Sequence, residues 1–159
     1  MKYEMKQKLF AFGKDFTIRD GEGRDVFRVD GKALSIGDKL SFQDMSGNEL
    51  AFIAQRVLSF KKRYEIHRDG SLFAEVVKEI TLFKDKLTVD IPGPNDYEVA
   101  GRFLDHEYRF VRSGREVAHV SKSYFSLVDS YGIDIEDGED DVTILATAVV
   151  IDLVSHSKE

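Results

Sequence analysis

Hydrophobic and polar residues alternate with a period of two along most of the chain. Phe16 and Ile18 are separated by a threonine, for example, and Leu40 and Phe42 by a serine. Because successive side chains of a β-strand point to opposite faces of a sheet, this alternation predicts strands with one buried and one solvated face. The pattern recurs at Tyr64/Ile66, Leu72/Ala74/Val76, Leu87/Val89/Ile91, Tyr97/Val99, Tyr108/Phe110 and Ile133/Ile135.

Short glycine-containing sequences separate these predicted strands. They are Asp20-Gly21, Ser46-Gly47-Asn48, Asp69-Gly70 and Ser113-Gly114. Such sequences supply the positive φ that tight hairpin turns require, so they predict antiparallel connections. Pro92 and Pro94 interrupt the alternation and predict a long turn between two strands. About a dozen short strands at this spacing are typical of a β-sandwich or a β-barrel.

The segment from Val142 to Val154 has a different pattern, because its apolar residues cover every side of a helical wheel. Its many β-branched residues leave a buried strand as the alternative, but thirteen residues exceed the usual strand of about 5–6. Glu139, Asp140 and Asp141 are placed to cap the start of a helix. Only a closed sheet could bury all faces of this helix. The sequence therefore predicts a mainly β fold, closed around one C-terminal helix.

Composition narrows the classes of function. With 159 residues, the chain 1–159 is predicted to form a single domain. A formal net charge of −6 disfavours general binding to nucleic acid and to anionic membranes, which are themselves negative. The chain contains no cysteine and shows no signal peptide, so we expect a cytoplasmic location. The apolar segment is shorter than the roughly 20 residues of a membrane-spanning helix.

Several motifs along the whole chain are typical of one protein family. They are Gln7-Lys8-Leu9-Phe10, Gly13-Lys14-Asp15-Phe16, Val29-Asp30-Gly31-Lys32, Gly37-Asp38-Lys39-Leu40-Ser41-Phe42, Ile91-Pro92-Gly93-Pro94, Asp137-Gly138-Glu139-Asp140-Asp141 and Ala148-Val149-Val150-Ile151-Asp152. With them the chain resembles the LURP-one-related family of the tubby C-terminal-like superfamily, which also includes phospholipid scramblases. The resemblance implies a closed, roughly twelve-stranded antiparallel barrel with the apolar helix through its centre.

The same resemblance says less about function. Tubby domains bind phosphoinositides, and scramblases act with lipid and calcium, whereas the LURP-one group has no settled biochemical activity. No lipid-contacting motif of the superfamily matches this sequence residue by residue. The resemblance therefore assigns no site residue.

Lys61, Lys62 and Arg63 form the densest basic cluster that precedes a predicted strand. They are candidate ligands for an anionic phospholipid headgroup, since arginine can donate two parallel hydrogen bonds to phosphate and Tyr64 could offer a stacking face. The alternative is a solvated loop whose lysines protect a strand edge from aggregation.

The acidic run from Asp134 to Asp141 suggests a calcium site. An EF-hand loop places its glycine sixth and oxygen ligands first and third. With Gly138 sixth, the first and third residues are Ile133 and Ile135, so this register fails. A different carboxylate site stays open, beside the simpler interpretation of a strand end followed by a helix cap.

Asp152 lies within the apolar helix, and His156 follows one turn later on the same face. The two could form an acid–base pair or ligate a metal. Alternatively Asp152, together with Asp140, Asp141 and His156, is a structural polar residue that anchors the helix to the strands, because a buried carboxylate needs donors.

The remaining histidines, His67, His106 and His119, have no spacing typical of a metal site. His67 is expected on the exposed face of its strand, and His119 on the core face that it shares with Val117. Neither a G-x-S-x-G elbow nor a glycine-rich phosphate loop is present.

The sequence thus favours a non-enzymatic binding module, without a cofactor, that recognises a lipid headgroup, a small ligand or a protein partner. The alternative is a metal-dependent or hydrolase-like enzyme with a carboxylate–histidine site at a barrel end.

Overall fold

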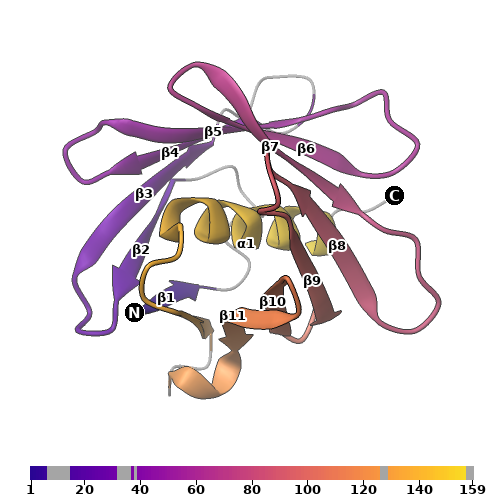
Figure 1. Ribbon diagram of the computed structural model, residues 1–159. Helices are drawn as coiled ribbons and strands as arrows, with labels where there is room; N and C mark the ends of the chain where they lie inside the picture. Colours follow the sequence, from indigo (N-terminus) through magenta and orange to yellow (C-terminus); the bar gives the residue numbers. More distant parts are fainter. Residues whose placement is uncertain (7–14, 32–36, 38, 126–128, 157–159) are drawn as a thin grey trace.

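A computed structural model of the chain describes residues 1–6, 15–31, 37, 39–125 and 129–156, the last of these without its side chain. Within these residues, twelve strands surround a single α-helix (Figure 1). The elements are β1 (Lys2–Lys6), β2 (Phe16–Asp20), β3 (Asp25–Gly31), β4 (Lys39–Asp44), β5 (Glu49–Gln55), β6 (Arg63–Arg68), β7 (Ser71–Lys78), β8 (Asp85–Asp90), β9 (Tyr97–Arg102), β10 (Glu107–Arg112), β11 (Arg115–Ser121), the 3₁₀-helix η2 (Lys122–Tyr124), β12 (Ser130–Ile135) and α1 (Asp141–His156).

The sheet closes into a barrel because β1, the first strand, pairs with both β2 and the last strand, β12. Each strand pairs antiparallel with its neighbours in the chain, and Tyr3 of β1 lies opposite Asp20 of β2 and Ile133 of β12. α1 lies inside the barrel, and its residues 144–151 have no exposed surface. The prediction of a closed antiparallel barrel around a central helix is confirmed, and the alternative of a buried strand at 142–154 is wrong.

Consecutive connections lie at opposite ends of the barrel, because every strand runs antiparallel to the one before it. We call one end the turn end; its connections are residues 21–24, 45–48, 69–70, 91–96 and 113–114, with the β12–α1 connection. We call the other the loop end; it includes residues 56–62, 79–84 and 103–106 and the last turn of α1. In Figure 1 the connections 56–62 and 79–84 of the loop end lie at the right, on the side of the C-terminus.

The turn end consists mainly of the tight turns that the sequence predicts. Asp69 and Gly70 have φ values of 51° and 77°, and Ser113 and Gly114 have the same pair of values. Two consecutive positive φ angles define the type I′ turn that suits hairpins. The predicted turns at 69–70 and 113–114 are therefore confirmed, as is the long turn that contains the two prolines, between β8 and β9.

The turn at Asp20-Gly21 differs from the prediction, because the positive φ of 83° belongs to Gly23. The Asp20 carboxylate accepts hydrogen bonds from the backbone N–H groups of Glu22 and Arg24, at 2.9 and 3.0 Å. These bonds spread the turn over several residues, as side-chain-capped turns do. The left-handed position therefore falls two residues later than predicted.

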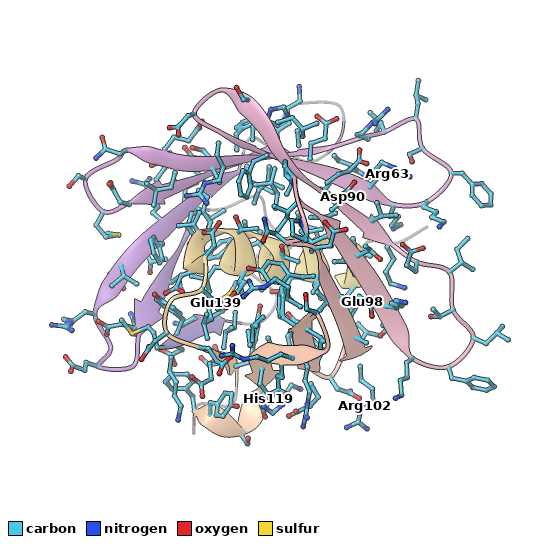
Figure 2. The ribbon with its side chains drawn as sticks, in the orientation of Figure 1. Arg63, Asp90, Glu98, Arg102, His119 and Glu139 are labelled. Atoms are coloured by element: carbon cyan, nitrogen blue, oxygen red, sulfur yellow. The ribbon has the colours of Figure 1, made fainter. Side chains whose placement is uncertain are left out.

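His119 lies on the outer face of the barrel rather than in the core (Figure 2). Phe110 pairs with Ala118, whereas the residue after it pairs with Glu116, so Val117 is the extra residue of a β-bulge. The bulge resets the alternation, which leaves Val117 buried and turns His119 outward. There its Nδ1 lies 2.7 Å from the hydroxyl of a tyrosine in η2. His67, expected to be exposed, is partly buried beside Glu65.

Within the described residues, no helix has both the length and the apolar character needed to cross a bilayer.

Candidate functional site

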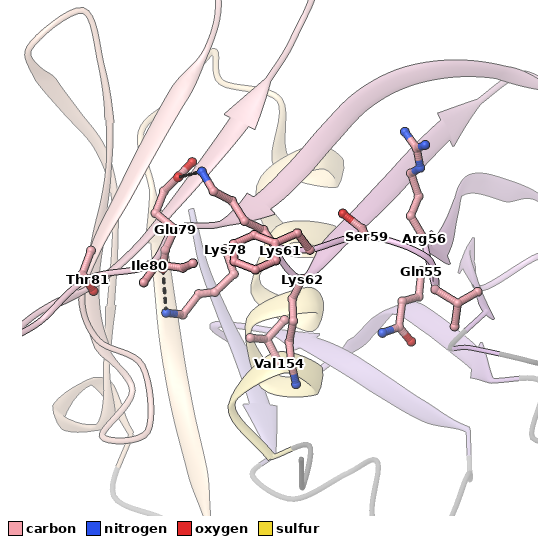
Figure 3. Close-up of a pocket in the computed structure, with 12 residues that line it drawn as sticks. Gln55, Arg56, Ser59, Lys61, Lys62, Lys78, Glu79, Ile80, Thr81 and Val154 are labelled. Atoms are coloured by element: carbon pink, nitrogen blue, oxygen red, sulfur yellow. Dashed lines mark hydrogen bonds and ion pairs between the residues drawn. The ribbon is translucent and has the colours of Figure 1, made fainter.

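The loop end carries a groove between the β5–β6 and β7–β8 connections (Figure 3). Its volume is about 610 Å³, and Val154 of α1 lies along one wall. The polar side chains that matter for its chemistry are Arg56, Lys61, Lys62, Lys78 and Glu79.

One backbone hydrogen bond joins the bases of the two connections, and one more closes the base of each connection. The N–H of Lys78 donates to the carbonyl of Lys62 at 2.9 Å, and the N–H of Arg56 donates to the carbonyl of Arg63 at 2.8 Å. The N–H of Glu79 likewise donates to the carbonyl of Lys86 at 2.9 Å. The backbone at the base of the groove is therefore held by the same kind of hydrogen bonds as the sheet. These bonds fix the backbone positions of Arg56, Lys62, Lys78 and Glu79.

The lining of the groove is rich in basic residues although the chain as a whole is negative. Four basic residues and one acidic residue line it, against a formal net charge of −6 for the chain. Arg56, Lys61 and Lys78 also pair with the carboxylates of Glu75, Glu79 and Asp85, at 3.2, 2.7 and 3.9 Å. Lys61 Nζ donates to the Glu79 carboxylate at 2.7 Å, and this hydrogen bond lowers the pKa of Glu79. Lys62 extends along Val154 at the last turn of α1 (Figure 3), where the negative end of the helix dipole favours a cation.

The structure brings together two of the three predicted headgroup ligands. Lys61 and Lys62 line the groove, but Arg63 donates instead to the carboxylate of Glu75 at 2.7 Å. Arg56 shares that carboxylate at 3.2 Å. The separation has a simple cause, since Arg63 is the first residue of β6 whereas the two lysines precede the strand.

Tyr64 does not offer the stacking face that we expected. It follows Arg63 in β6 and is 2% exposed, because the alternation of the strand turns it into the barrel core. Lys78, which the sequence analysis missed, supplies a third lysine from the next strand. Its place opposite Lys62 depends on the pairing of β6 with β7, which no local pattern reveals.

The acidic run before α1 is paired with side chains from three different parts of the barrel. Glu139 accepts two hydrogen bonds from Arg112 of β10, at 2.5 and 2.6 Å, and lies beside the start of the helix (Figure 2). Asp140 accepts from Arg68 of β6 at 2.8 and 3.0 Å.

The same run also begins the helix. A carboxylate oxygen of Asp140 accepts from the backbone N–H of Thr143 at 3.3 Å, the geometry of a helix cap. Asp141 accepts from the hydroxyl of Tyr3 in β1 at 2.5 Å. These contacts support the interpretation of a strand end followed by a cap that fixes the helix to the barrel wall.

Asp152 occupies a buried polar cluster near the other end of α1. Its carboxylate accepts from the hydroxyl of Tyr131 at 2.5 Å and lies 3.2 Å from Nε2 of His106. The imidazole of His106 stacks on the ring of Tyr131, with centroids 4.1 Å apart. Burial, with the nearby Asp152 charge, raises the pKa of Tyr131 well above its usual value.

The predicted pair of Asp152 with His156 stays a prediction, because the side chain of His156 lies outside the described part of the chain. Among the described histidines, His106 from the β9–β10 turn is in contact with Asp152. Both side chains of this pair are at most 2% exposed. The geometry supports the anchoring role for Asp152, which the Tyr131→Phe substitution can test. Among the residues that the structure describes, no three His, Asp or Glu side chains cluster to hold a metal.

Residues 1–152 match the sequence model of a family described as LURP-one-related. The uncharacterised protein YxjI of Bacillus subtilis strain 168 is 36% identical over 155 residues, which cover 98% of this chain and 94% of YxjI. Protein LURP-one-related 14 of Arabidopsis thaliana is 21% identical, over 93% of this chain and 81% of its own. An X-ray structure of another Arabidopsis thaliana protein superimposes with a TM-score of 0.74 at 20% identity, over 98% of this chain and 92% of that one. At this identity the superposition supports the fold alone.

Proposed function

The chain belongs to the LURP-one-related family, and we propose that it acts as a binding module for a phosphate-bearing, anionic ligand. The ligand would occupy the groove at the loop end. The observation that carries this proposal is the gathering of four basic side chains around one groove in a chain of net charge −6. Such a local positive field attracts an anion that the rest of the surface repels.

The chemistry of the groove suits phosphate. Lysine ammonium groups bind phosphate oxygens as mobile point charges, each with three donors. Lys61 comes from the β5–β6 connection and Lys78 from the end of β7, so a ligand with several phosphates could contact both sides of the groove at once. Glu79 holds Lys61 in position until a ligand phosphate competes for the same ammonium group.

A soluble headgroup provides the direct test. We expect calorimetric titration with inositol trisphosphate to show binding that weakens as salt rises, whereas inositol itself does not bind. Changing Lys61→Gln together with Lys62→Gln should weaken the affinity for inositol trisphosphate at least about tenfold, since hydrogen bonds to charged groups contribute about 1.5–3 kcal/mol.

A matched control removes the same charge from the opposite end. Arg24 and Arg115 lie at the turn end with side chains 71% and 68% exposed, so Arg24→Gln with Arg115→Gln should leave the affinity unchanged. Equal weakening in both double variants would show a non-specific effect of net charge. Lack of binding by the parent protein even at low salt would refute the anion site.

A further inference from the structure

The four most exposed large apolar side chains of the described residues all lie at the loop end. Leu58 and Phe60 are 100% and 93% exposed in the β5–β6 connection, and Leu82 and Phe83 are 92% and 96% exposed in the β7–β8 connection. We call these four residues the apolar tips. Single exposed apolar residues are ordinary on protein surfaces, but a concentration of them marks an interaction surface.

The apolar tips lie in connections that also carry basic residues. Lys61 and Lys62 belong to the β5–β6 connection, Lys78 ends β7, and Lys84 directly follows Phe83 in the chain. The acidic run at 134–141 belongs to the opposite, turn end of the barrel. The molecule therefore presents one apolar and positive end and one acidic end.

We propose that the apolar tips insert into the interfacial layer of an anionic phospholipid bilayer while the groove lysines contact lipid phosphates. This inference rests on the proposed function and deepens it, because it makes the ligand a headgroup within a membrane instead of a free anion. The loop end then faces the bilayer and the acidic turn end faces away. This orientation reconciles membrane contact with the negative net charge of the chain, since charges beyond about 8 Å are largely screened at physiological salt.

The chemistry of the tips fits a bilayer surface. Amphipathic segments that bind bilayers bury apolar side chains roughly 5–10 Å deep, at the boundary of headgroups and acyl chains. Phenylalanine and leucine supply the apolar surface, and flanking lysines extend their charged ends towards anionic headgroups. The two connections that carry the apolar tips are joined at their bases by the backbone hydrogen bond of 2.9 Å from Lys78 to Lys62, so both connections can face one bilayer.

The chain offers a sensitive reporter because it contains no tryptophan. With Phe60→Trp, we expect the indole emission to shift to the blue when vesicles of phosphatidylcholine and phosphatidylserine are added, and to be quenched by lipids brominated on the acyl chain. With Met45→Trp, at a residue of the turn end that is 50% exposed, neither change is expected. An unshifted emission from the Phe60→Trp protein would overturn the proposal.

A second measurement tests how much of the binding depends on the tips. Changing Leu82→Ser with Phe83→Ser, two tips outside the lining of the groove, should reduce co-sedimentation with the same vesicles at least about tenfold, because the variant has less apolar surface to transfer from water into the bilayer. Met45→Ser with Leu72→Ser, which alters two apolar residues outside the loop end that are 50% and 54% exposed, should leave it unchanged. Equal binding by the two double variants would refute insertion.

The outcomes separate this inference from the proposed function. If the Leu82→Ser, Phe83→Ser protein still binds inositol trisphosphate but not vesicles, both proposals are supported. If vesicle binding depends on the tips while inositol trisphosphate fails to bind, insertion stands and the groove proposal fails. A blue shift that grows with protein concentration without vesicles would show that the tips pack against a second copy of the chain, and would overturn the membrane assignment.

Discussion

The hydroxyl of Tyr131 in β12 donates a 2.5 Å hydrogen bond to the carboxylate of Asp152 in α1, inside the barrel. Both residues are at most 1% exposed. The bond joins the helix to the barrel wall near the loop end, while Glu139, Asp140 and Asp141 join it at the turn end. α1 is thus fixed at both of its ends by carboxylates.

We expect Tyr131→Phe to lower the free energy of unfolding by about 1–3 kcal/mol, because it leaves a buried carboxylate with one donor fewer. Tyr108 provides a matched control. It is equally buried, but its hydroxyl has no hydrogen-bond partner among the residues that the structure describes. Tyr108→Phe should therefore be neutral or slightly stabilising in urea unfolding. Equal losses in the two variants would contradict the anchoring role of the Tyr131 bond.

Stability should fall in alkaline solution. Burial raises the pKa of Tyr97 to about 12, and raises the pKa of Tyr108 and Tyr131 well above the usual value of 10.0. Above pH 10 the unfolded chain releases these protons while the folded protein keeps them, so the free energy of unfolding decreases as pH rises. The loss begins near pH 10 and for Tyr97 is complete above about pH 12.

Urea unfolding across this range measures the effect, and tyrosinate absorbance should rise together with unfolding. The Tyr131→Phe protein should show a shallower decrease than the parent. A free energy of unfolding that stays constant above pH 10 would argue against the burial of these hydroxyls.

Gly132 lets the segment of η2 lie directly against β12. A Cβ at this position would lie 2.6 Å from Cβ of Tyr124 and 2.7 Å from the ring of Phe125. Gly132→Ala should therefore destabilise the protein by about 1–3 kcal/mol through overpacking. Gly21→Ala is the control, since its Cβ would meet only ordinary contacts at 3.7 Å or more. A thermal midpoint for Gly132→Ala that matches this control would show that the segment can move away at little cost.

Calcium should not stabilise the protein. The three carboxylates before and at the start of α1 already accept hydrogen bonds: Glu139 from Arg112, Asp140 from Arg68, and Asp141 from Tyr3. A ligand that binds only the folded state adds about 2.7 kcal/mol at a hundredfold excess over its Kd. We expect no shift of the melting temperature in millimolar calcium. A rise that Asp137→Asn with Asp140→Asn abolishes would show a calcium site.

Val150→Asp should abolish soluble expression or cost at least about 3 kcal/mol, because the residue has no exposed surface and a new carboxylate would lack donors. Leu104→Asp, at a residue that is 63% exposed, should be tolerated. If the Val150→Asp protein is insoluble, Val150→Thr gives a measurable loss of about 1–3 kcal/mol in urea. A melting temperature unchanged by both substitutions at Val150 would contradict the central position of α1.

Most of the barrel could be predicted because its signals are local. The alternation around Phe16 and Ile18, and the type I′ turns at 69–70 and 113–114, depend on residues close together in the chain. The apolar wheel of α1 then requires a closed sheet around it. The bulge at Val117 escaped prediction because one inserted residue changes the face of His119 without changing any local preference.

The candidate sites depended on contacts between distant residues, and here prediction was incomplete. For Asp152 the sequence offered only His156, four residues later, whereas the fold places His106 against it from 46 residues earlier. Lys61 and Lys62 were recognisable as a cluster, but the contribution of Lys78 follows from strand pairing. The exposure of Leu58 and Phe60 could not be predicted either, because the sequence alone does not show whether an apolar residue in a connection is buried by other parts of the fold.

The order of elements has a consequence for how the protein is made. Because α1 follows all twelve strands in the chain, the ribosome has synthesised the whole barrel wall before the element that fills it. Until α1 is made, the inner faces of the strands lack the helix that they pack against in the folded protein. Pairing of β1 with β12 at that stage would close the barrel around an empty interior. We therefore expect the nascent chain to depend on chaperones, and the barrel to close only once α1 has been made, and comparatively slowly, as is usual for folds dominated by long-range contacts.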